Sequence, residues 1–427
     1  MSVRAPVEPP ALPRRRAVAT VFAVVFLDLL GFGIVVPILP YYVRSFPGAS
    51  DLYIGLLAAT YSVTQFVAAP YLGRLSDERG RRPVVLLSLL GSVIAWTLFG
   101  VGGSLLVLFA ARALAGAMGG NIAAAQAYVA DVTPAEGRAQ ALGLLGAAFG
   151  LGFIFGPALG GLFASEPVVA FFGRVLPGFV PVTPFSLPSF AAAALSLSAF
   201  GFAAAFLVEP DRERPAGARV SWGAQFRDAL RDDRLRWLVV AFFLVSVAFS
   251  GVQVMFIPFA ADYYGYAESQ TALLLTYVGA LGVLVQGVAV GPLTRRFGST
   301  RLAAVGAALL AVALGAIPFA PDAGRALLPA GPAFFTPELL ALLLVLPVLA
   351  LGNGTLSVSL TALVSDAAPR EGQGAGFGVT QSAGSLGRTV GPPAMAALYL
   401  GYYWAPFVAG ALFVVPVLAL LLVRRAR

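Results

Sequence analysis

Apolar residues occur along the chain in long runs that short polar segments separate. Each run has about 20 residues or more, the length that an α-helix needs to cross the hydrocarbon core of a bilayer. The pattern therefore predicts an all-α membrane protein with twelve transmembrane helices. The predicted spans are 17–41, 53–73, 83–102, 105–130, 139–163, 187–208, 236–261, 270–292, 302–320, 338–364, 374–399 and 403–423.

Arginine residues gather in alternate polar segments. With the N-terminus placed inside, 23 of the 28 basic residues, all arginine, fall on the inner side, and Arg44, Arg174 and Arg325 fall outside. This bias satisfies the positive-inside rule and predicts that both termini are cytoplasmic. It also accounts for the net charge of +8 without a nucleic-acid partner. We expect a multi-pass protein of a bacterial inner membrane.

Composition excludes several kinds of chemistry. Only 11% of the residues are charged, against roughly 25% in soluble domains, and 59% are hydrophobic. The chain has no His and no Cys, which excludes thiolate catalysis and Cys/His metal sites. Without lysine it also cannot form a phosphate-binding Gly-Lys loop. We therefore expect no catalytic residues, no metal and no cofactor.

The two halves of the chain repeat each other. The segment 131–137 matches 366–372, and the register continues without a gap to Pro157 and Pro392. A second match pairs 73–80 with 291–298. Six spans repeated in parallel are typical of transporters whose binding site lies between two halves. The sequence thus predicts two pseudo-symmetric six-helix bundles, at 1–208 and 236–427, joined by a cytoplasmic linker at 209–235.

Three ionisable residues lie within predicted spans, where an uncompensated charge is costly. Asp28 is the deepest acid, and burial favours its protonated form, so we predict that it carries the coupling proton. The alternative is a structural acid held by Arg112 or by the backbone. Arg112 could neutralise Asp28 or bind a carbonyl group of span one. A direct contact of Arg112 with the substrate is an equally open alternative. Arg388, which replaces the Phe153 of the repeat, could bind an anionic substrate or pair with a carbonyl or with Asp28.

Further polar and aromatic residues could line a central cavity, although such residues more often form contacts between helices. Gln126 shares a helix face with Arg112, and Asn121 lies on the opposite face, so only one of these faces can line the cavity. The cavity candidates are Arg112, Asn121, Gln126, Phe153, Gln253, Phe256, Asn353, Gln381 and Arg388.

Several segments resemble motifs of one transporter family. The stretch from Gly73 to Pro83, GRLSDERGRRP, is similar to the signature loop of the major facilitator superfamily, except that Glu78 replaces a basic residue. Residues 112–116 resemble the superfamily's fourth-helix arginine motif, and 152–161 resemble a motif typical of proton-coupled exporters. The first span, around Asp28, is similar to that of tetracycline and multidrug efflux members.

This resemblance implies roles for two groups of residues. Asp77, Arg81 and Asp131 would form a charge relay, with Asp77 facing the start of span eleven, and would hold the outward-open state. Asp77 and Arg81 also have the i,i+4 spacing of a helical ion pair. The alternative is that the arginines of this loop only set topology. The predicted cytoplasmic gate is Gly73, Asp77, Gly80, Arg81 and Asp131, and the exporter motif is Gly152, Gly156, Pro157, Gly160 and Gly161.

Together these features predict a proton-coupled secondary transporter that exports lipophilic small molecules or drugs by alternating access. We expect it to act as a monomer in the lipid bilayer, with the proton as coupling ion. A rival function within the same fold is export or flipping of an anionic lipid or organic acid through Arg388. A membrane-embedded enzyme is disfavoured, because one deep carboxylate cannot form a hydrolase pair.

Overall fold

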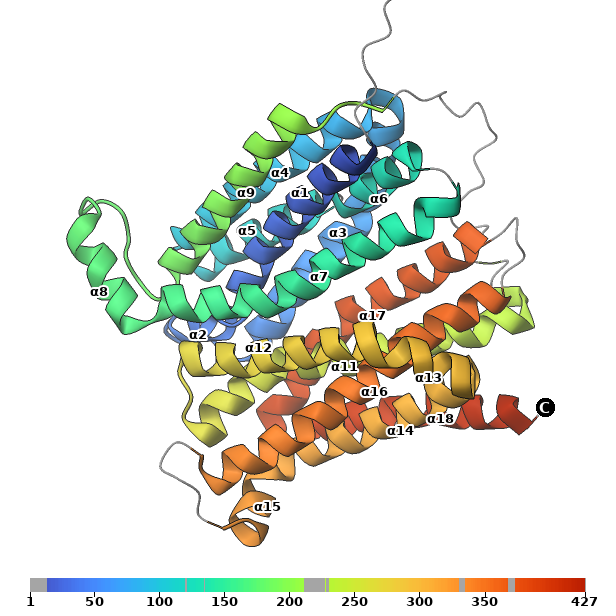
Figure 1. The fold of residues 1–427 in the computed structure, drawn as a ribbon. Helices are drawn as coiled ribbons and strands as arrows, with labels where there is room; N and C mark the ends of the chain where they lie inside the picture. Colours follow the sequence, from blue (N-terminus) through green and yellow to red (C-terminus); the bar gives the residue numbers. More distant parts are fainter. Residues whose placement is uncertain are drawn as a thin grey trace, which may run out of the picture.

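In the described residues the regular elements of the protein are helices. A bilayer core contains no water, so backbone groups there must form their hydrogen bonds within the protein, as they do in a helix. The computed structural model describes residues 14–119, 121–133, 135–210, 227, 230–329, 335–367 and 373–426. Most of the predicted linker lies outside these ranges, so the exact domain boundaries stay a prediction. Figure 1 shows two groups of helices, one blue to green and one yellow to red.

The first group of helices forms the N-terminal bundle. It contains α1 (Arg14–Val35), α2 (Leu39–Arg44), α3 (Leu52–Arg79), α4 (Arg81–Gly100), α5 (Leu105–Met118), α6 (Asn121–Val132), α7 (Ala135–Ala164), α8 (Glu166–Val175) and α9 (Ser186–Phe206).

The second group of helices forms the C-terminal bundle. It contains α11 (Asp233–Tyr264), α12 (Glu268–Leu284), a π-helical turn η1 (Val285–Ala289), α13 (Val290–Phe297), α14 (Ser299–Ala316), a 3₁₀ turn η2 (Ile317–Phe319), α15 (Ala320–Leu327), α16 (Pro337–Ala367), α17 (Gln373–Gly401) and α18 (Ala405–Ala426).

Within the described part of the chain, ten helices are long and apolar enough to cross a membrane. The predicted fourth span is not continuous, because α5 ends before Gly119 and α6 begins at Asn121. Glycine has low helix propensity, and a side chain at Gly119 would press on Gln65 and Tyr61 of α3. The predicted eleventh span corresponds to α17, which is not among these ten. Hydropathy alone did not predict α2, α8 or α15.

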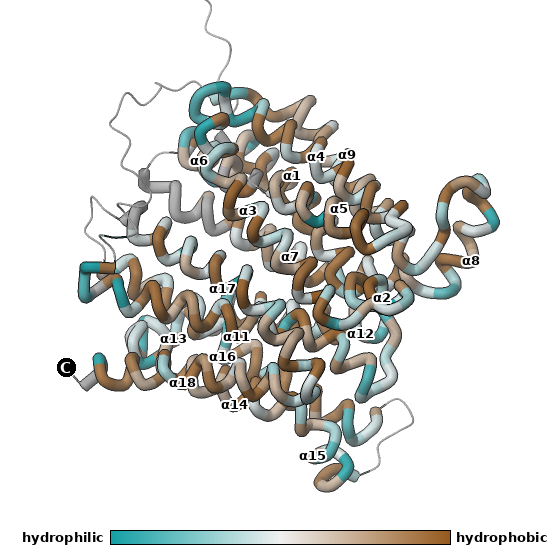
Figure 2. The backbone as a smooth tube through the Cα atoms, turned by 180° about the vertical axis from the view of Figure 1, so that it is seen from behind, coloured by the Kyte–Doolittle hydropathy of each residue, from teal (hydrophilic) through white to brown (hydrophobic). Residues whose placement is uncertain are grey.

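The two ends of the bundles differ in charge. The start of α1, the end of α18 and the arginine-rich α3–α4 connection lie at one end, which we name the basic side, whereas α2 and α8 lie at the other, the opposite side (Figure 1). Figure 2 shows brown, apolar segments along the helices and teal, polar segments mainly at their connections. This arrangement is the one that a lipid environment requires.

Glycine residues allow α1 and α7 to pack backbone against backbone. A Cβ atom on Gly156 would lie 2.6 Å from the Cα atom of Gly33, and one on Gly152 would lie 2.9 Å from the Cβ atom of Leu29. The repeat is reproduced in this packing, since Gly387 and Gly391 of α17 approach α11 in the same way. Close approach of small residues is a main source of helix association in membranes.

Two helix pairs join the bundles, α7 with α12 and α3 with α17. A Cβ atom on Gly279 would lie 2.7 Å from the carbonyl oxygen of Phe153. A Cβ atom on Gly55 would likewise meet the backbone of Pro392 and lie 2.8 Å from the Cβ atom of Ala396. The bundles are therefore in van der Waals contact along the halves of these helices that are nearer the opposite side.

We expect Gly156→Ala to destabilise the protein, because the added methyl group must push α1 and α7 apart at a backbone contact. Overpacking of this kind costs about 1–3 kcal/mol. A thermal unfolding series in detergent should show a lower midpoint for this variant. Gly146→Ala, on the same helix but with no atom within 4 Å of the new Cβ, is the control. Equal midpoints for the two variants would contradict the packing role of Gly156.

Candidate functional site

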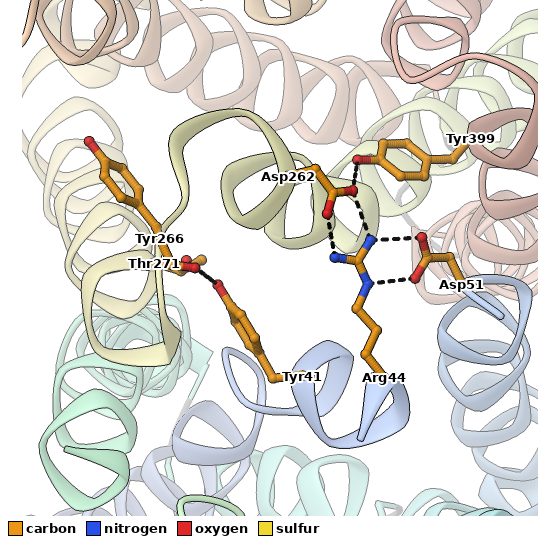
Figure 3. A network of polar contacts seen from close by, with 7 residues as sticks. All are labelled: Tyr41, Arg44, Asp51, Asp262, Tyr266, Thr271 and Tyr399. Carbon is orange, nitrogen blue, oxygen red and sulfur yellow. Dashed lines mark hydrogen bonds and ion pairs between the residues drawn. The ribbon is translucent and has the colours of Figure 1, made fainter. Parts of the chain in front are cut away.

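A charged cluster joins the two bundles at the opposite side (Figure 3). The Arg44 guanidinium donates from Nη1 and Nη2 to the two carboxylate oxygens of Asp262, over 2.7 and 2.9 Å. It also donates from Nε and Nη2 to the carboxylate of Asp51, over 2.8 Å each. The Tyr399 hydroxyl donates to Asp262 over 2.7 Å. This cluster links α2 and the start of α3 to α11 and α17 through paired, charge-assisted hydrogen bonds.

A tyrosine beside this cluster makes a second polar link between the bundles. The hydroxyl of Tyr41 on α2 donates to the carbonyl oxygen of Tyr266 over 2.6 Å and lies 2.7 Å from the hydroxyl of Thr271. Both partners belong to the start of α12 and the connection before it (Figure 3). The opposite side is therefore closed by contacts between the bundles.

Exposure along the helices at the bundle interface shows that the basic side is open. On each of α7, η1/α12 and α17, an interface residue nearer the basic side is exposed and one nearer the opposite side is buried. Because exposure changes along the same helices, the bundles part toward the basic side. The exposed residues include Gly146, Gln286 and Arg388, and the buried ones include Gly161, Thr271 and Ala396.

A cavity of about 660 Å³ lies between α7 of the N-terminal bundle and α11, α12, η1 and α16 of the C-terminal bundle. Its volume is within the range of sites for drug-sized ligands, roughly 300–1,000 Å³. Its lining among the described residues is mostly aliphatic and aromatic, with no charged side chain, and three amides supply polarity. Those amides are Gln253, Gln286 and Asn353.

Four of the nine predicted cavity residues line this cavity, namely Phe153, Gln253, Phe256 and Asn353. Gln126 and Gln381 are exposed and do not belong to its described lining. The side chain of Asn121 lies outside the described residues. Gln286 of the cavity lining lies in the π-helical turn from Val285 to Ala289, whose geometry sequence reasoning did not predict. Single π-helical turns often occur at functional sites, but no residue pattern signals this one.

Arg112 lies inside the N-terminal bundle rather than at the cavity. Its guanidinium carbon lies 4.7 Å from the ring centre of Tyr61 and 5.9 Å from that of Phe32. Its Nε donates to the carbonyl oxygen of Leu57 over 3.5 Å. The expected carbonyl partner is therefore in α3, not in span one. Cation–π contacts and this carbonyl satisfy a buried charge that does not face the cavity.

Arg388 is exposed on α17, and its Nη2 donates to the Ser385 hydroxyl over 2.8 Å. Tyr61 of α3 lies within electrostatic range of Arg388, Arg112 and Asp28. Asp28 itself is partly buried on α1. The three predicted membrane-depth charges therefore all interact electrostatically with one tyrosine that sequence reasoning missed. The available signal was the polar stretch from Thr60 to Gln65 within the second predicted span.

The ion pairs implied for the predicted gate are present. Arg81 lies 2.7 Å from Asp77 through Nη1 and 2.9 Å from Asp131 through Nε, and all three residues belong to the N-terminal bundle. The residues just before α17, 368–372, lie outside the described ranges, so a contact of Asp77 with the start of that span stays a prediction. At Gly73 an added Cβ atom would have no described atom within 4 Å, so no described contact requires glycine there.

Gly80 lies in a turn that Glu209 stabilises. Sequence reasoning placed Gly80 in the gate but did not identify Glu209. Gly80 has φ +109°, which favours glycine, and a Cβ there would collide with the Glu209 carboxylate. That carboxylate accepts hydrogen bonds from the backbone nitrogens of Arg81 and Arg82 over 2.7 and 2.8 Å. An acid at a helix N-terminus is favourable. Glu209 thus ties the end of α9 to the start of α4.

The exporter-type motif lies where α1, α7 and α12 meet. Gly152, Gly156 and Gly160 approach α1, whereas a Cβ atom on Gly161 would lie 2.7 Å from Ala272 of α12. Pro157 lines the cavity. The motif thus combines packing within one bundle, contact between bundles and part of the cavity wall.

Comparison with known proteins agrees with this architecture. Residues 21–336 match the sequence profile of the Major Facilitator Superfamily. The chain belongs to the major facilitator superfamily. Within this superfamily, the class C tetracycline resistance protein of Escherichia coli is 32% identical over 305 residues, which cover 70% of this chain and 72% of that protein. Major facilitator superfamily domain-containing protein 10 of Homo sapiens is 28% identical over 318 residues, 64% of this chain and 67% of that protein.

Solved structures of superfamily members have the same fold. The human organic anion transporter MFSD10 (TETRAN) has a TM-score of 0.65 at 25% identity, with coverage of 96% of this chain and 100% of that chain. A bacterial homologue of the lysosomal transporter Spinster, in an inward-facing and unoccupied conformation, has a TM-score of 0.77 at 15% identity, with coverage of 96% and 97%. The predicted fold is confirmed, and the protein is a membrane transporter rather than an enzyme.

We expect Arg44→Gln to loosen the closed opposite side, because it removes the charge that two carboxylates share across the bundles. Spin labels on Tyr53→Cys and Tyr402→Cys, introduced into this naturally cysteine-free chain, would report the separation by double electron–electron resonance. The variant should show a longer and broader distance distribution. Arg174→Gln, an exposed arginine of α8, is the control. Identical distributions for both variants would exclude a closing role for Arg44.

Proposed function

We propose that this transporter exports lipophilic small molecules by alternating access, driven by a proton gradient. The observation that supports this most is the cavity between the bundles. Its apolar wall and three amides suit a lipophilic substrate with few polar groups. Tetracycline resistance proteins among the relatives support efflux of a drug-like compound.

The arrangement of contacts supports a transport cycle with two states. In the present state the Arg44 cluster closes the opposite side, and the cavity faces the basic side, which the positive-inside rule assigns to the cytoplasm. Cargo would enter from that side. Release would require the pair of Arg44 and Asp262 to separate while the basic side closes around Asp77, Arg81 and Asp131. Because one chain supplies both bundles, we propose a monomer in the bacterial inner membrane.

Asp28 is the proposed proton carrier. It lies partly buried on α1 and within electrostatic range of Tyr61, and α1 packs directly on the exporter-type motif of α7. A carboxyl group at this depth loses its negative charge when it binds a proton. Protonation therefore lowers the free-energy cost of keeping the group in the membrane interior. Loading and release of a proton at Asp28 would thus bias which side of the transporter is open.

We expect Asp28→Asn to abolish uphill export, because an amide imitates the protonated carboxyl permanently. The measurement is uptake of tetracycline and of ethidium into everted membrane vesicles with an imposed proton gradient, together with substrate-dependent proton release. Asp322→Asn, which changes an exposed acid paired with Arg325, is the control and should transport normally.

The two arms of this assay separate coupling from binding. The Asp28→Asn protein should still bind substrate when the gradient is absent, since Asp28 is outside the described cavity lining. Gradient-driven accumulation by the Asn variant at the level of the control would contradict the role of Asp28. Failure of the unmodified protein to accumulate either compound would contradict export of these two drugs.

A further inference from the structure

Two arginines at membrane depth have no carboxylate partner within the described part of the chain. Arg112 contacts two aromatic rings and one carbonyl, and Arg388 contacts the Ser385 hydroxyl. A charge in the membrane interior is costly unless a counter-ion or water compensates it. Arg112 is inside the N-terminal bundle and Arg388 is exposed on α17, whereas the described cavity lining is uncharged.

The helix face that carries Arg388 points toward α3. Arg388, Pro392 and Ala396 are spaced four residues apart, so they share one face of α17. Pro392 and Ala396 touch Gly55 on α3. One turn nearer the basic side, where the bundles part, the same face presents the exposed Arg388. Antiparallel α3 places Tyr61 at that level, in agreement with the electrostatic interaction between the two residues.

Tyr61 supplies a hydrogen-bond donor next to Arg112 and within electrostatic range of Arg388. Its hydroxyl receives only a long contact from the Gln65 amide, 3.4 Å, and donates to no described acceptor. Arg112 lies over its ring at 4.7 Å. A phenol hydroxyl beside an exposed guanidinium can donate to the oxygens of a carboxylate that the guanidinium binds in a bidentate manner.

A row of aromatic rings connects this position to the apolar cavity. The ring of Phe32 lies 5.3 Å from that of Tyr61 and 6.3 Å from that of Phe153, which lines the cavity. An amphipathic molecule can therefore place its apolar body against the cavity wall and its charged group near Arg388.

We propose that Arg388 and Tyr61, with Arg112 behind the tyrosine ring, form a subsite for the carboxylate of an amphipathic organic acid. This inference rests on the proposed function, because it assumes that the cavity holds the cargo. It narrows the substrate class from lipophilic compounds in general to lipophilic carboxylates.

The test is equilibrium binding to the full chain in lipid nanodiscs, by calorimetry. The probes are 1-naphthaleneacetate and its neutral analogue 1-naphthaleneacetamide, which differ in charge and hardly in shape. We expect the unmodified protein to prefer the acid. Arg388→Gln should weaken acid binding by about tenfold or more, the usual effect of losing a charge-assisted hydrogen bond, and leave amide binding nearly unchanged.

Two further variants and a control keep the test independent of folding defects. Arg388→Lys keeps the charge but not the planar donor pair, so its acid affinity should lie between those of the unmodified protein and Arg388→Gln. Tyr61→Phe should weaken binding of the acid and not of the amide. Arg301→Gln, which removes an exposed arginine on α14, should change neither affinity.

Equal affinity of the unmodified protein for acid and amide would overturn the proposal, as would an equal loss of both in Arg388→Gln. Failure of the broader proposed function is a separate result. Charge-selective binding without gradient-driven transport of either probe would contradict export, whereas transport of the amide without any preference for the acid would contradict the carboxylate subsite alone.

Discussion

The close approach of helix backbones between the two bundles is the contact on which the other features of the interface depend. Gly55 against α17, and Gly161 and Gly279 across the α7–α12 contact, leave no room for a side chain. Only because these helices touch there can Arg44 reach Asp262. The cavity lies where α7 and α12 diverge, and Gly279 belongs both to the helix contact and to the cavity lining.

The charged cluster on the opposite side is well formed and still easy to break. The side chains of Arg44 and Asp262 are 28% and 39% exposed, and exposed ion pairs contribute about 1 kcal/mol or less. A transporter needs two states of similar free energy, since a large difference would leave one of them unpopulated. A polar contact of modest strength, added to the glycine packing, keeps the free energies of the two states similar. A buried, strongly coupled ion pair would favour one state too much.

The sequence predicted what depends on local pattern and missed what depends on distant partners. The apolar runs and the repeat follow from hydropathy and spacing, and the small residues of the α7 motif follow from its resemblance to exporters. The structure reproduces them except for a continuous fourth span. Arg44 was only one of three outer arginines, because its partner Asp262 is 218 positions away and nothing local marks the pair. The break at Gly119 was visible as two consecutive glycines, yet the apolar run around it concealed it. The charged neighbours of Tyr61 belong to α1, α5 and α17, so they could not be predicted from the sequence around Tyr61 on α3.

The polarity of α17 has a consequence for how the protein is made. This helix does not meet the apolarity criterion that ten others meet, and it carries Arg388 in its middle. A segment of that kind partitions poorly into lipid by itself, because a central arginine opposes insertion. The glycines of α17 pack against α11, and its outer half packs against α3. The ribosome synthesises α3 long before α17. Stable insertion of α17 therefore waits for the N-terminal bundle, and assembly of the second half depends on the first half being in the membrane already.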